Sequence, residues 1–300
     1  TCSIAPQFTV TVSGGTMSAP ALLTAGSCSV LPANPAATSG GAAINITDAG
    51  SGTSTIFPQS IEMAWHVDWA TSDPTFLAFI GYWTSTTVPS GYSTDGGQNW
   101  QRFPVHPANI LPGGCVACST PLNIIMIPSN DSKPWYTKDG GATWTELLIA
   151  DIPTTGVVGY GHAYFNRHVC VAADRVNANT FYLFNYRRTG DGETPAYTGT
   201  QNLFRSTDSG DNWTKMNSAN IDVLAIVAAR LKAVPGNAGH LFLAPGKQGN
   251  PGDANPAGTK LWRSTDAGAT WTDVGTIGGV TIREPYCVGF GAAAPGQTYP

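Results

Sequence analysis

One eight-residue pattern occurs four times in this 300-residue chain. It reads Ser or Thr, any residue, Asp, any residue, Gly, two residues of any kind, and Trp. Successive Asp residues of the pattern lie 44, 69 and 58 positions apart. The fixed residues are Asp95, Gly97 and Trp100; Asp139, Gly141 and Trp144; Asp208, Gly210 and Trp213; and Asp266, Gly268 and Trp271. Four copies of this pattern indicate a chain built from repeated structural units.

Each residue type in the pattern suits a tight turn between two strands. A short carboxylate accepts hydrogen bonds from the backbone N–H groups that follow it. The Gly two positions later permits the positive φ that such a turn requires. The Trp then begins the next strand and buries a large aromatic area. We therefore interpret the four Asp residues as structural turn formers and not as catalytic acids.

Two apolar, β-prone segments precede each copy of the pattern. The nearer segments are 76–80, 123–127, 181–184 and 241–243, and the farther ones are 63–67, 115–118, 168–172 and 226–229. Turn-forming residues separate the two, and no stretch has helical periodicity. Each unit therefore reads as four antiparallel strands. Repeated units of this kind predict an all-β fold, a β-propeller of four-stranded antiparallel blades.

The chain length leaves the number of blades open. Residues 61–300 contain the four units, and 285–290 look like the start of a fifth. Residues 1–60 are rich in Ala, Gly, Ser and Thr and have one clear strand, at 8–12. We predict that residues 1–60 are a diverged blade, a linker or a donated strand. The propeller is then incomplete, or it is closed by residues 1–60, by self-association or by a partner chain.

Composition indicates the compartment of the protein and excludes some classes of partner. Only 11% of residues are charged and the net charge is −4, against about 25% charged residues in typical soluble domains. Because Lys and Arg are scattered, we expect no nucleic-acid partner, and no apolar run reaches the roughly 20 residues of a membrane helix. Sequons at Asn45, Asn130 and Asn212 and the low charge favour an extracellular protein. Since Thr1 is followed by no apolar leader, we expect that a signal peptide has been removed.

Six cysteines allow several disulfide pairings, of which Cys2 with Cys28 is the favoured one. Cys115 and Cys118 have the spacing of a redox or zinc motif. No second such pair and no His at ligand spacing accompany them, so we expect no metal. Structural disulfides or buried thiols are the favoured interpretation. No motif in the chain indicates a cofactor.

The repeated pattern resembles the Asp-box, or bacterial neuraminidase (BNR) repeat, of sialidases and other secreted glycosidase propellers. Segments 171–182, 203–208, 261–266 and 288–300 extend the resemblance to the C-terminal lobe of glycoside hydrolase family 74 xyloglucanases, over about residues 60–300. That resemblance implies two seven-bladed propellers clasping a β-glucan, with one catalytic Asp from each lobe and cleavage with inversion. The first lobe has no counterpart in this sequence, and residues 1–60 contain no recognisable second acid.

The segment 62–69 contains the candidate catalytic carboxylates Glu62 and Asp68. In a strand, Glu62, His66 and Asp68 share one face, whereas Trp65 and Trp69 share the other. Two acids on a channel-facing strand suit acid–base catalysis or binding of sugar hydroxyls. The alternative is a His–acid network that satisfies polar groups inside the central channel.

Other candidates for carbohydrate binding are aromatic or charged residues near predicted inner strands. The full set is Trp65, His66, Trp69, Tyr160, His162, Tyr164, Arg283 and Glu284. Packing within loops is the alternative for each of them. A sialidase would need three Arg residues and a Tyr–Glu pair, which this sequence does not present as a motif. We expect a glycan-directed or structural module that is not catalytic on its own; the alternative is an inverting endo-β-1,4-glucanase.

Overall fold

The structure is a computed structural model whose described elements are all strands. It describes residues 64–81, 90–107, 114–128, 133–149, 170–185, 202–216, 230–244, 260–282, 285 and 287–300, and the backbone of eight short strands before residue 64. The chain divides into two compact units, Thr1–Ile56 and Phe57–Pro300. Within the described residues, no helix has the length and apolarity needed to cross a membrane.

The described strands of the first unit form four two-stranded antiparallel ladders. They pair β1 (Cys2–Ile4) with β6 (Ser27–Cys28), β2 (Gln7–Thr9) with β5 (Ala21–Thr24), β3 (Val12–Ser13) with β4 (Thr16–Met17), and β7 (Ala36–Ala37) with β8 (Ala43–Ile44). Of the strand expected at 8–12, residues 8 and 9 belong to β2 and residue 12 to β3, and residues 10 and 11 lie outside the described residues. In the first ladder, Cys2 and Cys28 are Cα partners. Directly opposed Cα atoms of antiparallel strands lie about 4.5–5.5 Å apart, within the range of a disulfide, so the predicted bond remains a prediction that the register favours.

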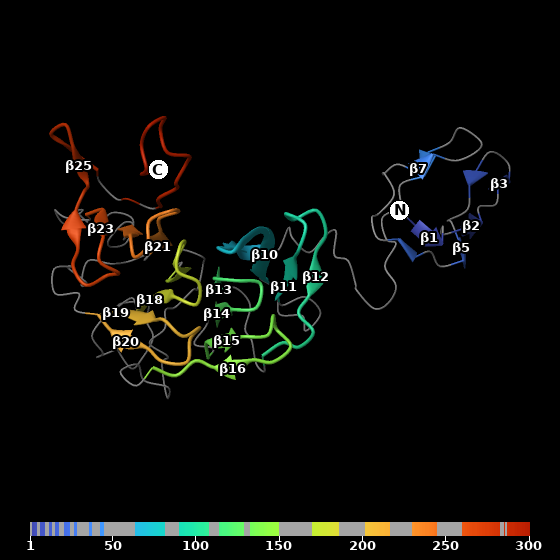
Figure 1. Ribbon diagram of the computed structural model, residues 1–300, viewed down its shortest axis with the longest axis horizontal. Coiled ribbons are helices and arrows are strands. Elements are labelled where there is room, and N and C mark those ends of the chain that lie inside the picture. The colour runs from blue at the N-terminus through green and yellow to red at the C-terminus, as the bar shows by residue number, and fades with distance from the viewer. Residues whose placement is uncertain are drawn as a thin grey trace, which may run out of the picture. The chain divides into compact units, whose positions relative to one another are not determined.

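The described residues of the second unit form four four-stranded antiparallel sheets, here called blades 1 to 4, which make up a propeller (Figure 1). Blade 1 comprises β9 (Ala64–Ala70), β10 (Asp73–Gly81), β11 (Ser90–Ser93) and β12 (Gln101–Arg102). Blade 2 comprises β13 (Gly114–Cys118), β14 (Ile124–Pro128), β15 (Trp135–Thr137) and β16 (Thr145–Glu146). Blade 3 comprises β17 (Val171–Ala173), β18 (Phe181–Asn185), β19 (Asn202–Ser206) and β20 (Thr214–Lys215). Blade 4 comprises β21 (Arg230–Ala233), β22 (Leu241–Ala244), β23 (Trp262–Ser264) and β24 (Thr272–Asp273).

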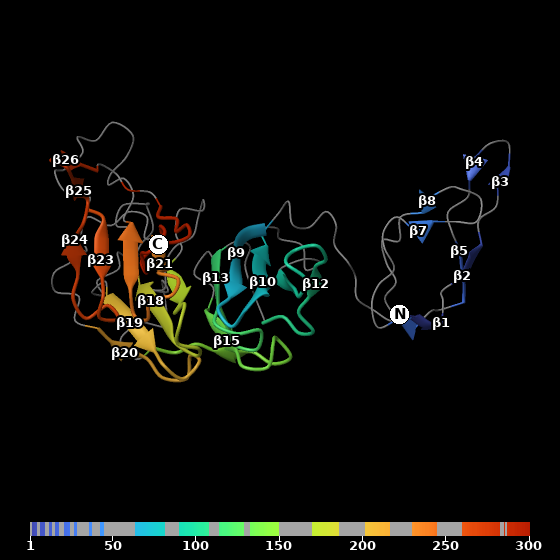
Figure 2. The same ribbon diagram turned by 45° about the horizontal axis from the view of Figure 1, so that its top comes forward.

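Strands follow one another in sequence order across every blade, from the centre of the propeller outward. The first strands of successive blades pack together, β9 with β13, β13 with β17, and β17 with β21. Figure 2 shows β9, β13 and β21 toward the middle of this unit, with β12 and β24 at its outer edges. A short hairpin, β25 (Thr276–Ile277) with β26 (Val280–Thr281), follows blade 4. The predicted blades are confirmed.

Among the described residues, the hydrophobic core lies between the blades, in three separate clusters. Strand β13 shows how one blade serves two of them, because successive side chains point to opposite faces. Its Cys115 and Ala117 pack against blade 3, whereas Val116 and Cys118 pack against blade 1. All five residues of β13 and all five of β14 are buried. A run of apolar residues without alternation is the expected sequence of a strand covered on both sides.

One strand prediction in the last part of the chain is wrong, and another lies outside the described residues. The inner strand of blade 4 is described at β21, where Leu231 and Ala233 face the core and Arg230 and Lys232 are half-buried. The segment expected for it, 226–229, lies outside the described residues. No strand forms at the described residues 285 and 287–290, where a fifth inner strand was expected. Phe290 instead packs edge-on against Phe242 of β22, with ring centroids 5.5 Å apart. Phe290 therefore meets blade 4 through a side-chain contact on the face of its sheet. A sheet face offers no backbone hydrogen-bonding partners for a further strand.

Candidate functional site

The four Asp-box turns share one hydrogen-bonding scheme. In each, the Asp Oδ1 accepts a hydrogen bond from the backbone N–H four positions later, at 2.8–2.9 Å. Its Oδ2 accepts one from the side chain of that same residue, at 2.6–2.7 Å. The preceding Ser or Thr hydroxyl donates to Oδ1 and accepts from the N–H of the box Gly at 2.9 Å. The Thr143 hydroxyl and amide lower the pKa of Asp139 to about 2, so these carboxylates stay ionised and fixed within turns.

The box glycines of blades 2, 3 and 4 also set the fit against the preceding blade. All four box glycines have positive φ, between 86° and 104°. A Cβ on Gly141 of blade 2 would lie 2.3 Å from Phe103 of blade 1, and one on Gly268 of blade 4 would lie 1.9 Å from Leu203 of blade 3. Gly is therefore required at these positions both for the turn and for the close approach of the preceding blade. The sequence pattern indicated the first reason only.

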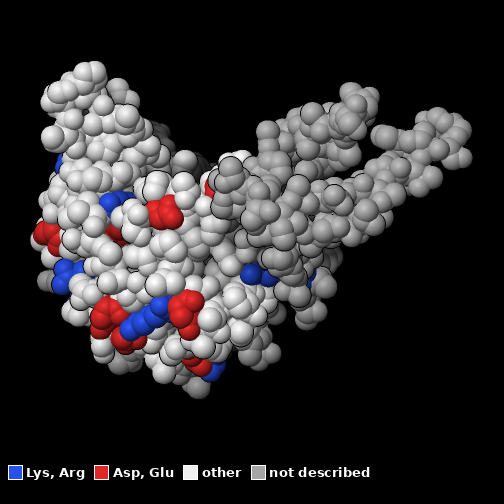
Figure 3. Space-filling model, turned by 45° about the vertical axis from the view of Figure 1, so that its right-hand side comes forward, with Lys and Arg blue, Asp and Glu red and all other residues white. Residues whose placement is uncertain are grey.

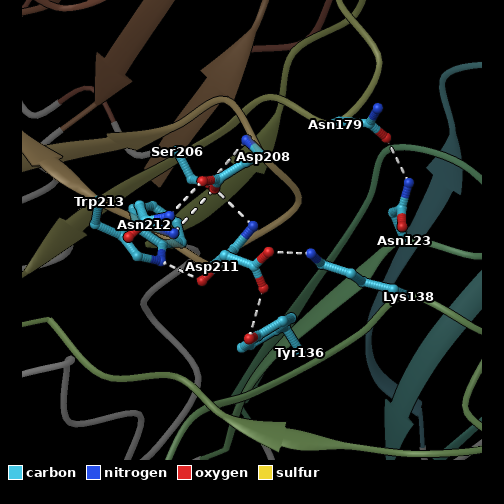
Figure 4. Close-up of polar contacts among 10 residues, drawn as sticks. Asn123, Tyr136, Lys138, Asn179, Ser206, Asp208, Asp211, Asn212 and Trp213 are labelled. Carbon is cyan, nitrogen blue, oxygen red and sulfur yellow. Dashed lines mark hydrogen bonds and ion pairs between the residues drawn. The ribbon is translucent and has the colours of Figure 1, made fainter.

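The indole of each box Trp fixes the start of the outermost strand. Three of the four donate Nε1–H to the carbonyl of their own box Gly, at 2.9–3.2 Å. Trp144 instead donates to the carbonyl of Val105 in blade 1, at 2.9 Å. Asp211, inside the third box, joins blades 2 and 3 because it accepts hydrogen bonds from Tyr136 and Lys138 (Figure 4). The box turns thus link blades along the outer part of the propeller.

The candidate acid Asp68 and the candidate carbohydrate-binding residue His66 both lie on β9, and both are hydrogen-bonded to the neighbouring strand β13. Nδ1 of His66 accepts the backbone N–H of Val116 at 3.1 Å, and Oδ2 of Asp68 accepts that of Cys118 at 2.9 Å. These N–H groups belong to alternate residues of β13, the edge strand of its sheet, so the two side chains satisfy an open ladder edge. Alternation along β9 explains why one face carries both groups.

Burial lowers the pKa of His66 to about 4, and the positive charges of Lys232 and Arg230 act in the same direction. The negative charge of Asp68 opposes the shift but does not overcome it. His66 is therefore neutral at physiological pH, with Nδ1 free to accept from Val116. In these described surroundings, the neutral His66 ring has a structural role as a hydrogen-bond acceptor.

Arg175, in the turn after β17, completes the environment of Asp68. Its guanidinium forms an ion pair with Asp68 Oδ1 and donates to the carbonyl of Trp69 at 2.7 Å. The same group lies over the Trp69 ring, 4.3 Å from the ring centroid. The side chains of Arg175 and Asp68 are only 8% and 7% exposed. Blades 1, 2 and 3 thus meet at one buried carboxylate, a role that reasoning from the sequence did not assign to Arg175.

Asp174, next to Arg175, connects blades 3 and 4 in a similar way. Its Oδ1 accepts the N–H groups of Val176 and Asn177, and its Oδ2 accepts the Tyr182 hydroxyl and the N–H of Gly239 in blade 4, each at 2.7–2.9 Å. Asp174 is 1% exposed. Both residues lie in the Asp-Arg-Val-Asn segment at 174–177, which the family resemblance had already marked. That resemblance is the signal by which these two residues could have been found.

Side chains of the inner hairpin turns continue this polar network. Thr71 of blade 1 donates to the carbonyl of Asp174, and Ser119 of blade 2 accepts the N–H of Asn179 at 2.7 Å. The side chains of Asn123 and Asn179 are hydrogen-bonded to each other (Figure 4). The inner turns of all four blades are therefore connected at the end of the propeller that carries the Asp-boxes.

Several residues predicted for a site lie outside the described part of the chain. They are Glu62, Tyr160, His162, Tyr164, Arg283 and Glu284, and of Trp65 only the backbone, within β9, is described. Their roles remain predictions. Asp68, His66 and Trp69 are the predicted site residues with described side chains, and the structure brings them together with Arg175 and Cys118. Among described residues, no group of three or more His, Cys, Asp or Glu is arranged to hold a metal ion.

Charged groups are sparse on the surface shown in Figure 3, and there the acidic and basic side chains lie mostly side by side. Lys133 pairs with Glu146, Lys138 with Asp211, and Lys260 with Asp273. This face therefore presents no broad field of one sign to a polyanionic partner.

Comparison with known proteins agrees with this architecture. The BNR/Asp-box repeat family matches at residues 92–102, the first box. A xyloglucanase from a Paenibacillus species is 29% identical over 235 residues, covering 77% of this chain and 19% of its own length. The xyloglucanase Xgh74A of Acetivibrio thermocellus is 30% identical over 234 residues, covering 78% and 22%. The crystal structure of a GH74 enzyme from Niastella koreensis aligns with a TM-score of 0.51 at 24% identity, covering 78% and 27%.

These findings define the class of protein as an Asp-box β-propeller. Within that class, the chain is similar to the GH74 xyloglucanases, as the sequence resemblance predicted. The chain spans about a fifth of the length of the curated relatives it matches.

Proposed function

We propose that this chain is a secreted, carbohydrate-directed propeller module that does not cleave a glycan on its own. The observation that carries the proposal is the state of Asp68, which is buried and has both carboxylate oxygens engaged, one by the Cys118 N–H and one by Arg175. In this position Asp68 serves to join blades 1, 2 and 3. Low charge and three sequons support secretion.

The other described carboxylates support the same proposal. An inverting glycosidase needs one protonated acid with a raised pKa and one base, with their carboxyl groups about 6.5–9.5 Å apart. Every described acid has a hydrogen-bond or ion-pair partner: Asp68, Asp73, Asp95, Asp139, Glu146, Asp174, Asp208, Asp211, Asp266 and Asp273. Where their pKa is shifted, hydrogen bonds move it downward, as for Asp73 and Asp139. Such groups are poor general acids at neutral pH.

The carbohydrate part of the proposal rests on the relatives and on the aromatic residues. The matched relatives are named xyloglucanases, and aromatic rings such as Trp65, Tyr160 and Tyr164 are the residue type that stacks on sugar rings. We assign a branched β-glucan as the glycan class. His162, Arg283 and Glu284 are the polar groups proposed to bind its hydroxyls.

Affinity electrophoresis tests the binding directly. The chain is expected to migrate more slowly in a native gel containing xyloglucan than in a gel without polysaccharide. An unbranched β-1,4-glucan derivative serves as the matched control polymer, and Tyr160→Ala with Tyr164→Ala is expected to reduce the retardation. Equal migration in all gels would overturn the carbohydrate assignment.

An inverting endo-β-1,4-glucanase is the second candidate function. It is favoured by the similarity to xyloglucanases over 77–78% of the chain and by Glu62, which is outside the described residues. This candidate predicts release of reducing ends from xyloglucan, and loss of that release in Glu62→Gln and in Asp68→Asn.

An array of inner strands that is open between its first and last members suits a partner. Close packing of the described inner strands joins β9, β13, β17 and β21 in order, and no comparable packing of these strands joins β21 back to β9. We propose that residues 1–60, a second copy or a partner chain completes the ring. Light scattering on the purified chain is expected to give a multiple of 31.3 kDa if copies do so, and a single-chain mass if they do not.

A further inference from the structure

Two cysteines from different blades lie side by side in the core between blades 2 and 3. Cys115 is in β13, and Cys170 directly precedes β17, the neighbouring inner strand. Both are 2% exposed and belong to the same hydrophobic cluster. Their Sγ atoms are 3.5 Å apart, so a disulfide requires the two sulfurs to approach by about a further 1.5 Å.

The other described cysteines are placed differently. Cys118 is on the opposite face of β13 from Cys115 and packs in the cluster between blades 1 and 2. Alternation along a strand therefore separates the two thiols of the Cys115–Cys118 motif, and Cys170 is the neighbour of Cys115. Cys287 is exposed and lies after the last hairpin.

We propose that Cys115 and Cys170 form a disulfide that ties blade 2 to blade 3 when the chain folds in an oxidising compartment. The two thiols lose two protons and two electrons, and one S–S bond forms. The oxidant is a low-molecular-weight disulfide of the glutathione type, which is cleaved to two thiols. The exchange proceeds through a mixed disulfide on one cysteine, which the other then attacks.

The electrostatics of the pair support this chemistry. The Sγ atoms of Cys115 and Cys170 are within hydrogen-bonding distance, and either thiol can donate. This interaction is the main cause that lowers the pKa of Cys115; burial opposes it. The same interaction and burial raise the pKa of Cys170. The interaction between the two sulfurs thus favours a thiolate within the pair, and a thiolate is the attacking species in disulfide exchange.

Burial also bears on when the bond forms and how long it lasts. Both sulfurs are enclosed by apolar side chains from two blades, so a small oxidant reaches them before the blades close or during transient opening. Once formed, the bond is shielded from reductant in the same way. The disulfide would close a loop spanning 55 sequence positions, and loops of this length restrict the unfolded chain strongly.

Peptide mapping of the intact chain tests the proposal. The protein is expressed through a secretory route, its thiols are blocked with N-ethylmaleimide under denaturing, non-reducing conditions, and it is digested with trypsin. Trypsin releases residues 103–138, with Cys115 and Cys118, separately from 168–175, with Cys170. We expect these two peptides to be cross-linked before reduction and separate after it. Recovery of Cys115 and Cys170 as maleimide adducts in separate peptides would overturn the proposal.

Two serine variants identify the sulfur involved and measure its effect. Cys115→Ser is expected to abolish the cross-link, whereas Cys118→Ser, at a buried site on the same strand, is expected to keep it. Reductant should lower the melting temperature of the wild type and of Cys118→Ser by roughly 10 °C more than that of Cys115→Ser. An equal effect of reductant on all three proteins contradicts an interblade bond. If Cys115→Ser does not fold, the mapping of the wild-type chain still decides the question.

Discussion

Arg175 of blade 3 forms a buried ion pair with Asp68 of blade 1, although blade 2 separates the two blades in the sequence. Asp68 also accepts a hydrogen bond from Cys118 of blade 2, so three blades share one carboxylate. Removing one partner of a buried pair leaves the other charge without compensation, which costs about 3–5 kcal/mol. The position of this pair therefore implies a large effect on stability and a testable role in holding the propeller together.

Arg175→Met is expected to lower the free energy of unfolding by about 3–5 kcal/mol, because Asp68 would stay buried without its cation. Urea denaturation at neutral pH measures the loss. The matched control is Lys133→Met, which breaks an ion pair with side chains 54% and 26% exposed and should change stability by less than about 1 kcal/mol. Similar losses of stability in both variants would show that the Asp68–Arg175 pair contributes no more than an exposed ion pair.

Gly141→Ala is expected to destabilise the chain more than Gly97→Ala. Both glycines have positive φ, 88° and 89°, so each substitution carries a cost of about 1–2 kcal/mol for a left-handed alanine. A Cβ on Gly141 would also lie 2.3 Å from Phe103, whereas one on Gly97 has its nearest contacts at 3.4 Å. Overpacking should add about 1–3 kcal/mol to the first variant only. Equal unfolding midpoints of the two variants would contradict a role of the box glycine in packing between blades.

Ala267→Gly is expected to stabilise the chain slightly. Ala267 follows Asp266 in the fourth box and has φ of 60°, a conformation unfavourable for alanine. Relief of this strain outweighs the greater flexibility of glycine in the unfolded chain, for a net gain of roughly 0.5 kcal/mol. Ala269→Gly, two residues away and without positive φ, should instead lower stability. Thermal denaturation of both variants gives the two signs, and a loss in both would refute the strain.

Stability is expected to fall on acidification because of His66. Its folded pKa of about 4 lies below the ordinary value of 6.5, so the unfolded chain binds more protons between these two values. Stability is therefore fully present above pH 6.5 and is lost as pH falls toward 4, by about 2 kcal/mol at pH 5. Urea midpoints at pH 7 and pH 5 measure this loss.

His66→Asn provides the control for that pH dependence. The amide oxygen of Asn can still accept a hydrogen bond from Val116 but does not titrate. Stability of the variant should change less between pH 7 and pH 5 than that of the wild type. The remaining change reflects other groups, including His106 and His240, whose pKa values burial also lowers. An unchanged pH dependence would assign the effect to those groups.

The blades themselves could be predicted from local sequence, because each Asp-box encodes its own turn and the strands beside it. The position of β21 could not be read from apolar content, since its residues alternate. Leu231 and Ala233 face blade 3, whereas Arg230 and Lys232 point the other way and make the segment look polar. A period of two is the signal for a strand of this kind.

Contacts between blades could not be predicted from the sequence, and the physical reason differs from the one that applies to β21. The alternation of β9 predicted that His66 and Asp68 share a face, but not which backbone groups they meet. Arg175 lies 107 residues from Asp68, and Cys170 lies 55 residues from Cys115. Such pairs are determined by how the blades stack, which no local pattern encodes. The fit of box glycines against the preceding blade was hidden for the same reason.

Release of reducing ends from xyloglucan is the measurement that tests the central claim most directly. The purified, folded chain is incubated with the polysaccharide at neutral pH, alongside Glu62→Gln, and new reducing ends are counted over time. We predict no release above a protein-free control, with retardation of the same preparation in a xyloglucan gel. Sustained release by the wild type that is lost in Glu62→Gln, while circular dichroism shows the variant folded, would contradict a module that is not catalytic on its own.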